Sequence, residues 1–103
     1  EQGKLDEAKE LIERAVELAP DSPDILDTQA QILMKSGNLK EALAKATLAY
    51  RNSNEKNVDI TLNYVELLVL NNRKSRAKKV IENVKTNSEV QEAKKLQLQT
   101  MIN

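Results

Sequence analysis

The amino-acid sequence predicts an all-α protein built as a solenoid of antiparallel helical hairpins. Gly3-Lys-Leu-Asp-Glu-Ala8 recurs as Gly37-Asn-Leu-Lys-Glu-Ala42, a displacement of 34 residues, and a fixed period of that size is typical of stacked helical units. Only two glycines, two prolines and two aromatic residues occur among 103 residues, so turn-forming and strand-forming residues are scarce. Apolar residues recur at intervals of three and four, the spacing of amphipathic helices.

The first two helices are expected at residues 4–19 and from Pro23 onward. Pro20 ends the first helix, and Ser22 can cap a second helix that has Pro23 at its first position, where the missing N–H costs nothing. Gly37 fits the left-handed residue just beyond a helix C-terminus. The apolar stripe of the first helix comprises Leu5, Ala8, Leu11, Ile12, Ala15, Val16 and Ala19, and that of the second Leu26, Ala30, Leu33 and Met34.

Four further segments complete the pattern. The third helix is expected at 39–51, with small residues at Ala42, Ala46 and Ala49 that allow close helix approach. A fourth runs from about 57 to Leu70, and Asn71-Asn72 replaces the turn glycine, because asparagine also tolerates the left-handed conformation. A fifth is expected at 75–85. The last begins after Ser88 and carries Val90, Ala93, Leu96, Leu98, Met101 and Ile102.

These residues resemble the tetratricopeptide repeat family. A helix pair recurs every 34 residues, with small residues at Ala8, Ala15, Ala42 and Ala49 and a proline at Pro20. The resemblance implies one domain, a right-handed superhelix of five to six helices over residues 1–103. Residues 1–22 would be the second helix of a partial repeat, 23–56 a full repeat, 57–90 a degenerate full repeat, and 88–103 a C-terminal or capping helix.

Several positions depart from the family pattern. Leu26 and Thr61 replace the usual early aromatic residue, and Gln29 and Tyr64 replace the leucine that follows it. Ala42 and Ala77 are 35 residues apart, so the loop at 52–57 holds one extra residue. The style of the repeats also resembles long bacterial proteins made of many such units, so the chain is expected to be a fragment of a longer protein.

The family resemblance implies a protein–protein interaction module in which the first helices line a concave groove for a peptide or helix. The groove would be acidic with apolar spots, without the basic clamp that holds chaperone tails. An exposed apolar patch at Met34, Leu62 and Val69 would favour binding; burial of those side chains would favour a structural spacer. The inward residues implied by register are Asp24, Asp27, Gln31, Met34, Asp59, Leu62, Asn63, Glu66 and Val69.

The acidic residues of this set also have a simpler interpretation. Asp24 and Asp59 fall in the first turns of their predicted helices, where carboxylates interact favourably with the helix dipole without any ligand. Glu66 falls in the third turn of an otherwise apolar helix, beside Asn63, and a solvated face would account for it as well. Both interpretations stay open.

Charge is uneven along the chain although it sums to zero. Residues 1–27 hold nine acidic and three basic residues, net −6, whereas residues 73–103 hold three acidic and eight basic residues, net +5. Arbitrary ends of a longer array would explain this, and weak head-to-tail self-association is the alternative. The basic run around Arg73–Lys85 argues weakly for nucleic acid, because single-strand binders add stacking aromatics and only Tyr50 and Tyr64 occur.

Composition weighs against an enzyme. The chain has no histidine and no cysteine, so catalysis would depend on carboxylates, lysines or hydroxyls on helix faces expected to be wet. No calcium-loop spacing and no glycine-rich phosphate loop occurs, and we predict no catalytic residue, metal or cofactor. No apolar run is long enough for membrane insertion. Either a cytoplasmic or a cell-envelope location is compatible with the sequence.

Overall fold

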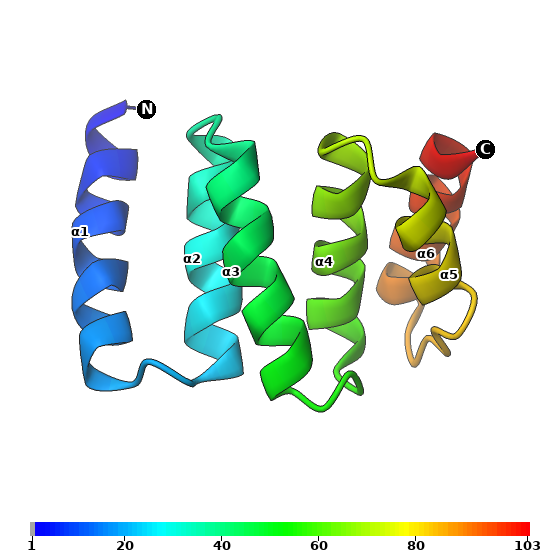
Figure 1. Cartoon of the computed structure of the whole chain (residues 1–103), viewed down its shortest axis with the longest axis horizontal. Helices are drawn as coiled ribbons and strands as arrows, with labels where there is room; N and C mark the ends of the chain where they lie inside the picture. Colours follow the sequence, from blue (N-terminus) through cyan, green and yellow to red (C-terminus); the bar gives the residue numbers. More distant parts are fainter. Residues whose placement is uncertain (1) are drawn as a thin grey trace.

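The structure is a computed structural model that describes residues 2–103. Its helices are α1 (Gln2–Leu18), α2 (Pro23–Lys35), α3 (Leu39–Asn52), α4 (Val58–Leu70), α5 (Lys74–Ile81) and α6 (Glu89–Ile102). No strand occurs in this part of the chain. Figure 1 shows the helices following one another from α1 at one end to α5 and α6 at the other, with α2, α3 and α4 between them. The all-α helical repeat fold predicted from the sequence is therefore confirmed.

The helices α2, α4 and α6 begin in the same way. The side chains of Ser22, Asn57 and Ser88 accept hydrogen bonds from the backbone N–H three residues further on, at 3.4, 3.0 and 3.1 Å. Each bond satisfies one N–H that the first helical turn leaves without a partner. Pro23 follows Ser22 at the start of α2, as predicted.

Three helices end in left-handed turns. Gly37 has φ +84° after α2, Asn72 has φ +61° after α4, and Asn54 has φ +60° after α3. The N–H three residues beyond each helix end bonds back across the turn, for example from Asn38 to the Leu33 carbonyl at 2.9 Å, which satisfies a terminal carbonyl. The predicted roles of Gly37 and of the asparagine pair are therefore confirmed.

The core is centred on α4. Eight of its thirteen residues are buried, because α2, α3, α5 and α6 all pack against it. The predicted small residues of α3, Ala42, Ala46 and Ala49, are also buried, so this helix lies close to α2 and α4. Tyr50 and Tyr64 stack in the core with ring centroids 4.5 Å apart, and burial raises the pKa of Tyr50.

The fifth helix is shorter than the predicted 75–85. It ends at Ile81, and the chain turns through Glu82 and Asn83 before the irregular residues 84–87 lead into α6. Val84 is buried as expected although it is not helical, and Lys95 Nζ donates to its carbonyl at 2.6 Å. Val80, Ile81 and Val84 have helical spacing, but the chain has to reverse direction before Ser88. The helix therefore ends at Ile81.

The last helix is also less buried than its predicted stripe. Leu98 is buried and Ile102 packs against the core, but Val90 is 81% exposed, and Leu96 and Met101 are exposed too. The reason is that α6 packs only against α4 and α5 within the described residues. An apolar stripe stays in solvent where no neighbouring helix covers it.

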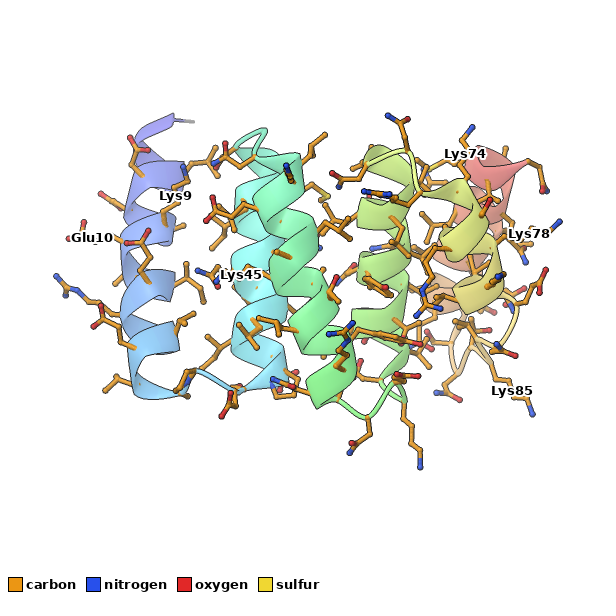
Figure 2. The ribbon with its side chains drawn as sticks, in the orientation of Figure 1. Lys9, Glu10, Lys45, Lys74, Lys78 and Lys85 are labelled. Atoms are coloured by element: carbon orange, nitrogen blue, oxygen red, sulfur yellow. The ribbon has the colours of Figure 1, made fainter. Side chains whose placement is uncertain are left out.

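Charged side chains extend from both ends of the helix row. Figure 2 shows Glu10 on α1 pointing outward at one end, and Lys74 and Lys78 on α5 at the opposite end. No helix among residues 2–103 has the length and apolar content needed to cross a membrane.

Candidate functional site

The helices α2, α4 and α6 carry a set of polar side chains that meet across helix boundaries. We call their shared surface the first-helix face, defined by Asp24, Asp27, Gln31, Met34, Asp59, Asn63, Glu66, Gln91 and Lys94. The three helices are joined because α4 packs against both α2 and α6. The first-helix face therefore combines residues that are more than sixty positions apart in the sequence.

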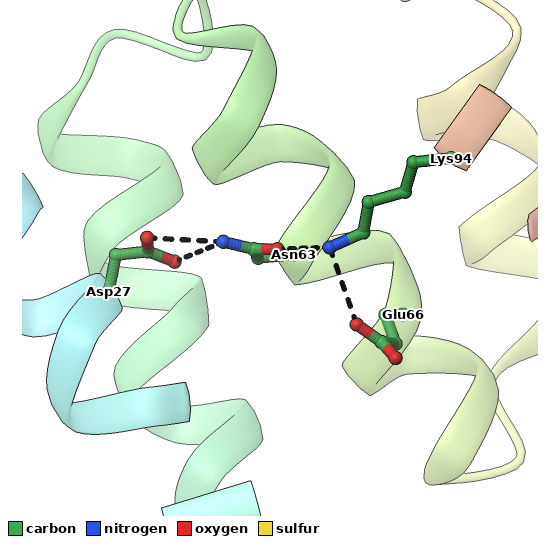
Figure 3. Close-up of polar contacts among 4 residues, drawn as sticks. All are labelled: Asp27, Asn63, Glu66 and Lys94. Atoms are coloured by element: carbon green, nitrogen blue, oxygen red, sulfur yellow. Dashed lines mark hydrogen bonds and ion pairs between the residues drawn. The ribbon is translucent and has the colours of Figure 1, made fainter. Parts of the chain in front are cut away.

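A polar network crosses this face. Asn63 Nδ2 on α4 donates to both carboxylate oxygens of Asp27 on α2, each at 3.1 Å. Lys94 Nζ on α6 donates to Asn63 Oδ1 and forms an ion pair with Glu66 Oε1 at 3.5 Å. Figure 3 shows the four side chains in this order, with Asn63 between the carboxylate of Asp27 and the amine of Lys94. The network thus links α2 to α4 and α4 to α6.

A second contact lies beside it. Gln91 Nε2 on α6 donates to Asp59 Oδ1 on α4 at 3.1 Å. Asp59 and Asp24 are exposed, whereas Asp27, Asn63, Glu66 and Lys94 are half-buried. The face therefore has exposed carboxylates beside a partly dehydrated network.

Electrostatics on the face are dominated by carboxylates. The pKa of Asp27 lies above its usual value of 3.8, first because burial disfavours the charged form and also because Asp24 and Asp59 repel it. The Asn63 hydrogen bond and the positive charge of Lys94 oppose that rise. The face carries the carboxylates of Asp24, Asp27, Asp59 and Glu66. Among the described residues, only Glu66 of these four has an ion-pair partner within 4.0 Å.

Comparison with known families gives one match. Residues 1–45 match the model of the tetratricopeptide repeat, a segment that covers α1, α2 and the first half of α3. This N-terminal part of the chain is therefore similar to a tetratricopeptide repeat. No curated protein matches the chain. Tetratricopeptide repeats are generally protein-interaction modules and typically act as scaffolds without catalytic activity.

Two apolar residues predicted for the groove do not lie on an accessible surface. Leu62 is 1% and Val69 is 8% exposed, because α4 is surrounded by four helices. Met34 is half-buried and packs against the core. Of the two alternatives left open by the sequence, an exposed apolar patch that would favour binding and buried side chains that would favour a spacer, Leu62 and Val69 agree with the spacer, and Met34 lies between the two.

Two residues of the first-helix face, Gln91 and Lys94, were not predicted from the sequence. A usable signal was present, because Ser88 caps α6 as Asn57 caps α4. Alignment of the two caps places Lys94 at the position that Asn63 has in α4. Among the described residues, no group of three or more histidine, cysteine, aspartate or glutamate side chains is placed to hold a metal ion. The contacts seen on the face are hydrogen bonds and one ion pair.

Proposed function

We propose that this chain is a non-catalytic protein-interaction module whose first-helix face binds a peptide or a helix of a partner protein. The observation that carries the proposal is the gathering of Asp24, Asp27 and Asp59 on two adjacent helices, since Asp24 and Asp59 both act electrostatically on Asp27. A tetratricopeptide repeat is generally an interaction module. The proposed partner is therefore a protein segment, without a cofactor, a metal or a nucleic acid.

Charge balance indicates the chemistry of that segment. The Asp27 carboxylate accepts from the neutral amide of Asn63, and Asp59 accepts from the neutral amide of Gln91. These amides satisfy oxygen lone pairs without cancelling the negative charge. Because the cation Lys94 already pairs with Glu66, a lysine or arginine from the partner would complement the remaining carboxylates.

Peptide display tests this proposal. Peptides selected on the wild-type chain should be enriched in lysine and arginine and should lose binding to a variant with Asp24→Lys and Asp59→Lys. These positions are suitable because both are exposed. Glu41→Lys is the matched control, since Glu41 is also an exposed acid in the first turn of its helix, α3. Equal loss of binding in the control would refute a specific role for the first-helix face.

A structural spacer is the second candidate function. Burial of Leu62 and Val69 and the internal bonding of Asp27, Asn63 and Lys94 support it, because these groups hold the helices together without a ligand. The spacer predicts that no peptide family is enriched on the wild-type chain over the Asp24→Lys and Asp59→Lys variant.

A further inference from the structure

A small hollow lies between two connections of the chain. One wall is the end of α3 with the loop that leads into α4, and the other is the end of α5 with the segment that leads into α6. Both connections lie at the lower edge of the molecule in Figure 1. The hollow has a volume of about 310 Å³, at the lower end of the range of about 300–1,000 Å³ found for small-molecule sites. We call it the loop hollow, and its lining includes Glu55, Lys56, Thr61, Val80, Val84 and Lys85.

Each wall of the loop hollow is held in place by hydrogen bonds of its own. In the first wall, the Glu55 N–H donates to the Tyr50 carbonyl at 3.0 Å, and the Tyr50 hydroxyl donates to Glu55 Oε1 at 3.4 Å. In the second wall, Lys95 Nζ donates to the Val84 carbonyl at 2.6 Å. The hollow is therefore formed before any ligand arrives, which lowers the entropy cost of binding.

A buried hydroxyl group at this hollow lacks a hydrogen-bond partner. Thr61 lines the hollow and is only 5% exposed. The other threonines within helices, Thr28, Thr47 and Thr100, each donate to the carbonyl four residues earlier, at 2.7–3.1 Å. The Thr61 hydroxyl makes no such bond, and no other, within residues 2–103. Because a buried polar group without a partner costs free energy, a polar ligand atom at this position would gain a hydrogen bond.

The apolar part of the lining is small. It comes mainly from Val80 and Val84, which pack into the core and are 5% and 8% exposed. Only a narrow apolar surface is therefore open to the hollow. Such a surface suits a short aliphatic group, because the gain in free energy depends on the apolar area that is covered.

The rim of the loop hollow carries more positive than negative charge. Neither Lys56 nor Lys85 has an ion-pair partner within 4.0 Å in the described part of the chain, and Figure 2 shows Lys85 projecting from this edge of the molecule. Glu55 is the one acidic residue of the lining. Its carboxylate accepts from the Tyr50 hydroxyl and interacts electrostatically with Arg76. The uncompensated lysines favour an anionic ligand.

We propose that the loop hollow binds a small aliphatic carboxylate. The alkyl group would pack against Val80 and Val84, and the carboxylate would accept a hydrogen bond from the Thr61 hydroxyl. Lys56 and Lys85 would balance the negative charge. One ligand can reach all of these groups because they line a single hollow of about 310 Å³. The small volume favours a free acid over a longer chain that carries the same carboxylate.

An NMR titration with 4-methylpentanoate tests the proposal on the 103-residue chain. The backbone amide signals of residues 55–61 and 80–87 should shift and reach saturation. The matched controls are 4-methylpentanamide, which lacks the charge, and acetate, which lacks the alkyl chain. Each should bind at least about tenfold more weakly than the probe. Equal binding of either control, or no shift in these residues, would overturn the proposal.

The substitution Thr61→Val separates ligand binding from protein stability. It removes the hydroxyl and keeps the branched shape of the side chain, so 4-methylpentanoate should bind about tenfold more weakly. Urea titration should show no loss of stability, because the hydroxyl has no partner in the free protein. Thr61→Ser keeps the hydroxyl and should bind like the wild type. Unchanged binding to Thr61→Val would overturn the assigned hydrogen bond.

A pair of lysine substitutions tests the charge. Lys56→Gln with Lys85→Gln should weaken binding of 4-methylpentanoate about tenfold and remove most of its salt dependence. Lys40→Gln with Lys74→Gln is the matched control, since both are exposed lysines outside the loop hollow. Equal weakening by the two pairs would indicate general attraction of anions and would overturn the site.

The source of the carboxylate is tested with N-acetylglycylleucine, which presents a similar alkyl group and a carboxylate at the end of a peptide. It should bind more weakly than 4-methylpentanoate, and tighter binding would overturn the assignment to a free acid. None of the substitutions in the loop hollow changes a residue of the first-helix face. Binding of a carboxylate here and of a basic peptide there can therefore fail independently.

Discussion

The central helix α4, which is apolar over most of its length, and the end helix α1, which alternates apolar and charged residues, differ in what they bury. The thirteen residues of α4 include eight buried ones, whereas the described side chains of the longer α1 include none that is fully buried. Four helices pack against α4 and one packs against α1. In a solenoid, therefore, the number of neighbours and the apolar content of a helix together determine how much it contributes to the core.

This difference predicts uneven stability along the chain. A helix that contacts one neighbour can separate from the rest at a smaller free-energy cost than a helix enclosed by four. The polar network from Asp27 to Lys94 also crosses α4. It therefore holds α4 to two of its neighbours and does not involve α1. We expect α4 to be the last element to open and α1 to be among the first.

The largest expected effect comes from removing a core side chain of α4. Leu67 is fully buried, so Leu67→Ala should lower the free energy of unfolding by about 2–5 kcal/mol, because it leaves a cavity among four helices. Leu18→Ala on the exposed side of α1 should change it by no more than about 0.5 kcal/mol. Urea titration measures both, and equal losses would contradict the contrast between the two helices.

Replacing a buried alanine by leucine should cost more stability in a central helix than in the end helix α1, although the effect is smaller than that of Leu67→Ala. Ala49 of α3 is fully buried, so Ala49→Leu should cost about 1–3 kcal/mol through overpacking. Ala15 is its counterpart in α1, 34 residues earlier, and is only half-buried, so Ala15→Leu should cost less. Ala44→Leu, at an exposed position of α3, is the control. A loss of only a few tenths of a kcal/mol in the free energy of unfolding for Ala49→Leu would show that α3 is not closely packed against its neighbouring helices at this position.

The turn after α4 should contribute less to the free energy of unfolding than these buried side chains do. Asn72 has φ +61°, a left-handed conformation that costs most residues about 1–2 kcal/mol and asparagine less. We expect Asn72→Ala to lower the free energy of unfolding by about 1 kcal/mol. Asn72→Gly should match or exceed the wild type, since glycine adopts this conformation freely. Thermal unfolding of the two variants compares them, and identical stabilities would contradict the role of the turn.

The smallest expected effect concerns the contact between α2 and α4. Because the pKa of Asp27 is raised above 3.8, chiefly by burial, the folded state binds its proton more tightly than the unfolded state does. The stability contribution of Asp27 is therefore greatest below pH 3.8 and declines as the pH rises through the raised pKa. Asp27→Asn does not titrate, so its stability relative to the wild type should improve between about pH 3 and about pH 7. Urea titrations at both pH values measure this difference, and a constant difference would contradict the assigned burial of the charge.

Much of the helical framework was predictable because local chemistry defines it. Ser22 with Pro23 predicted the start of α2, Gly37 its end, and Asn71-Asn72 the end of α4, since each depends on the conformational preference of a few adjacent residues. The end of α5 was not predictable in this way. The apolar spacing that includes Val84 continues past Ile81, and only the packing of the following segment against the core makes the chain turn there.

The candidate site was predictable in part. Register and the family resemblance identified Asp27, Asn63 and Glu66 as residues of the first helices, and the structure joins them in one network with Lys94. The same register could not distinguish an accessible apolar residue from a buried one. Leu62 and Val69 are buried because α6 as well as α2 packs on α4.

The sequence by itself determined the all-α class, the 34-residue period, the caps and the opposite charges of the two ends, because these properties depend on composition or on residues close together in the chain. Only the tertiary structure decided which stripes are covered, where α5 ends and how Lys94 meets Asn63 and Glu66. These features depend on the neighbours of each helix. Burial and long-range hydrogen bonds arise only when distant segments pack together.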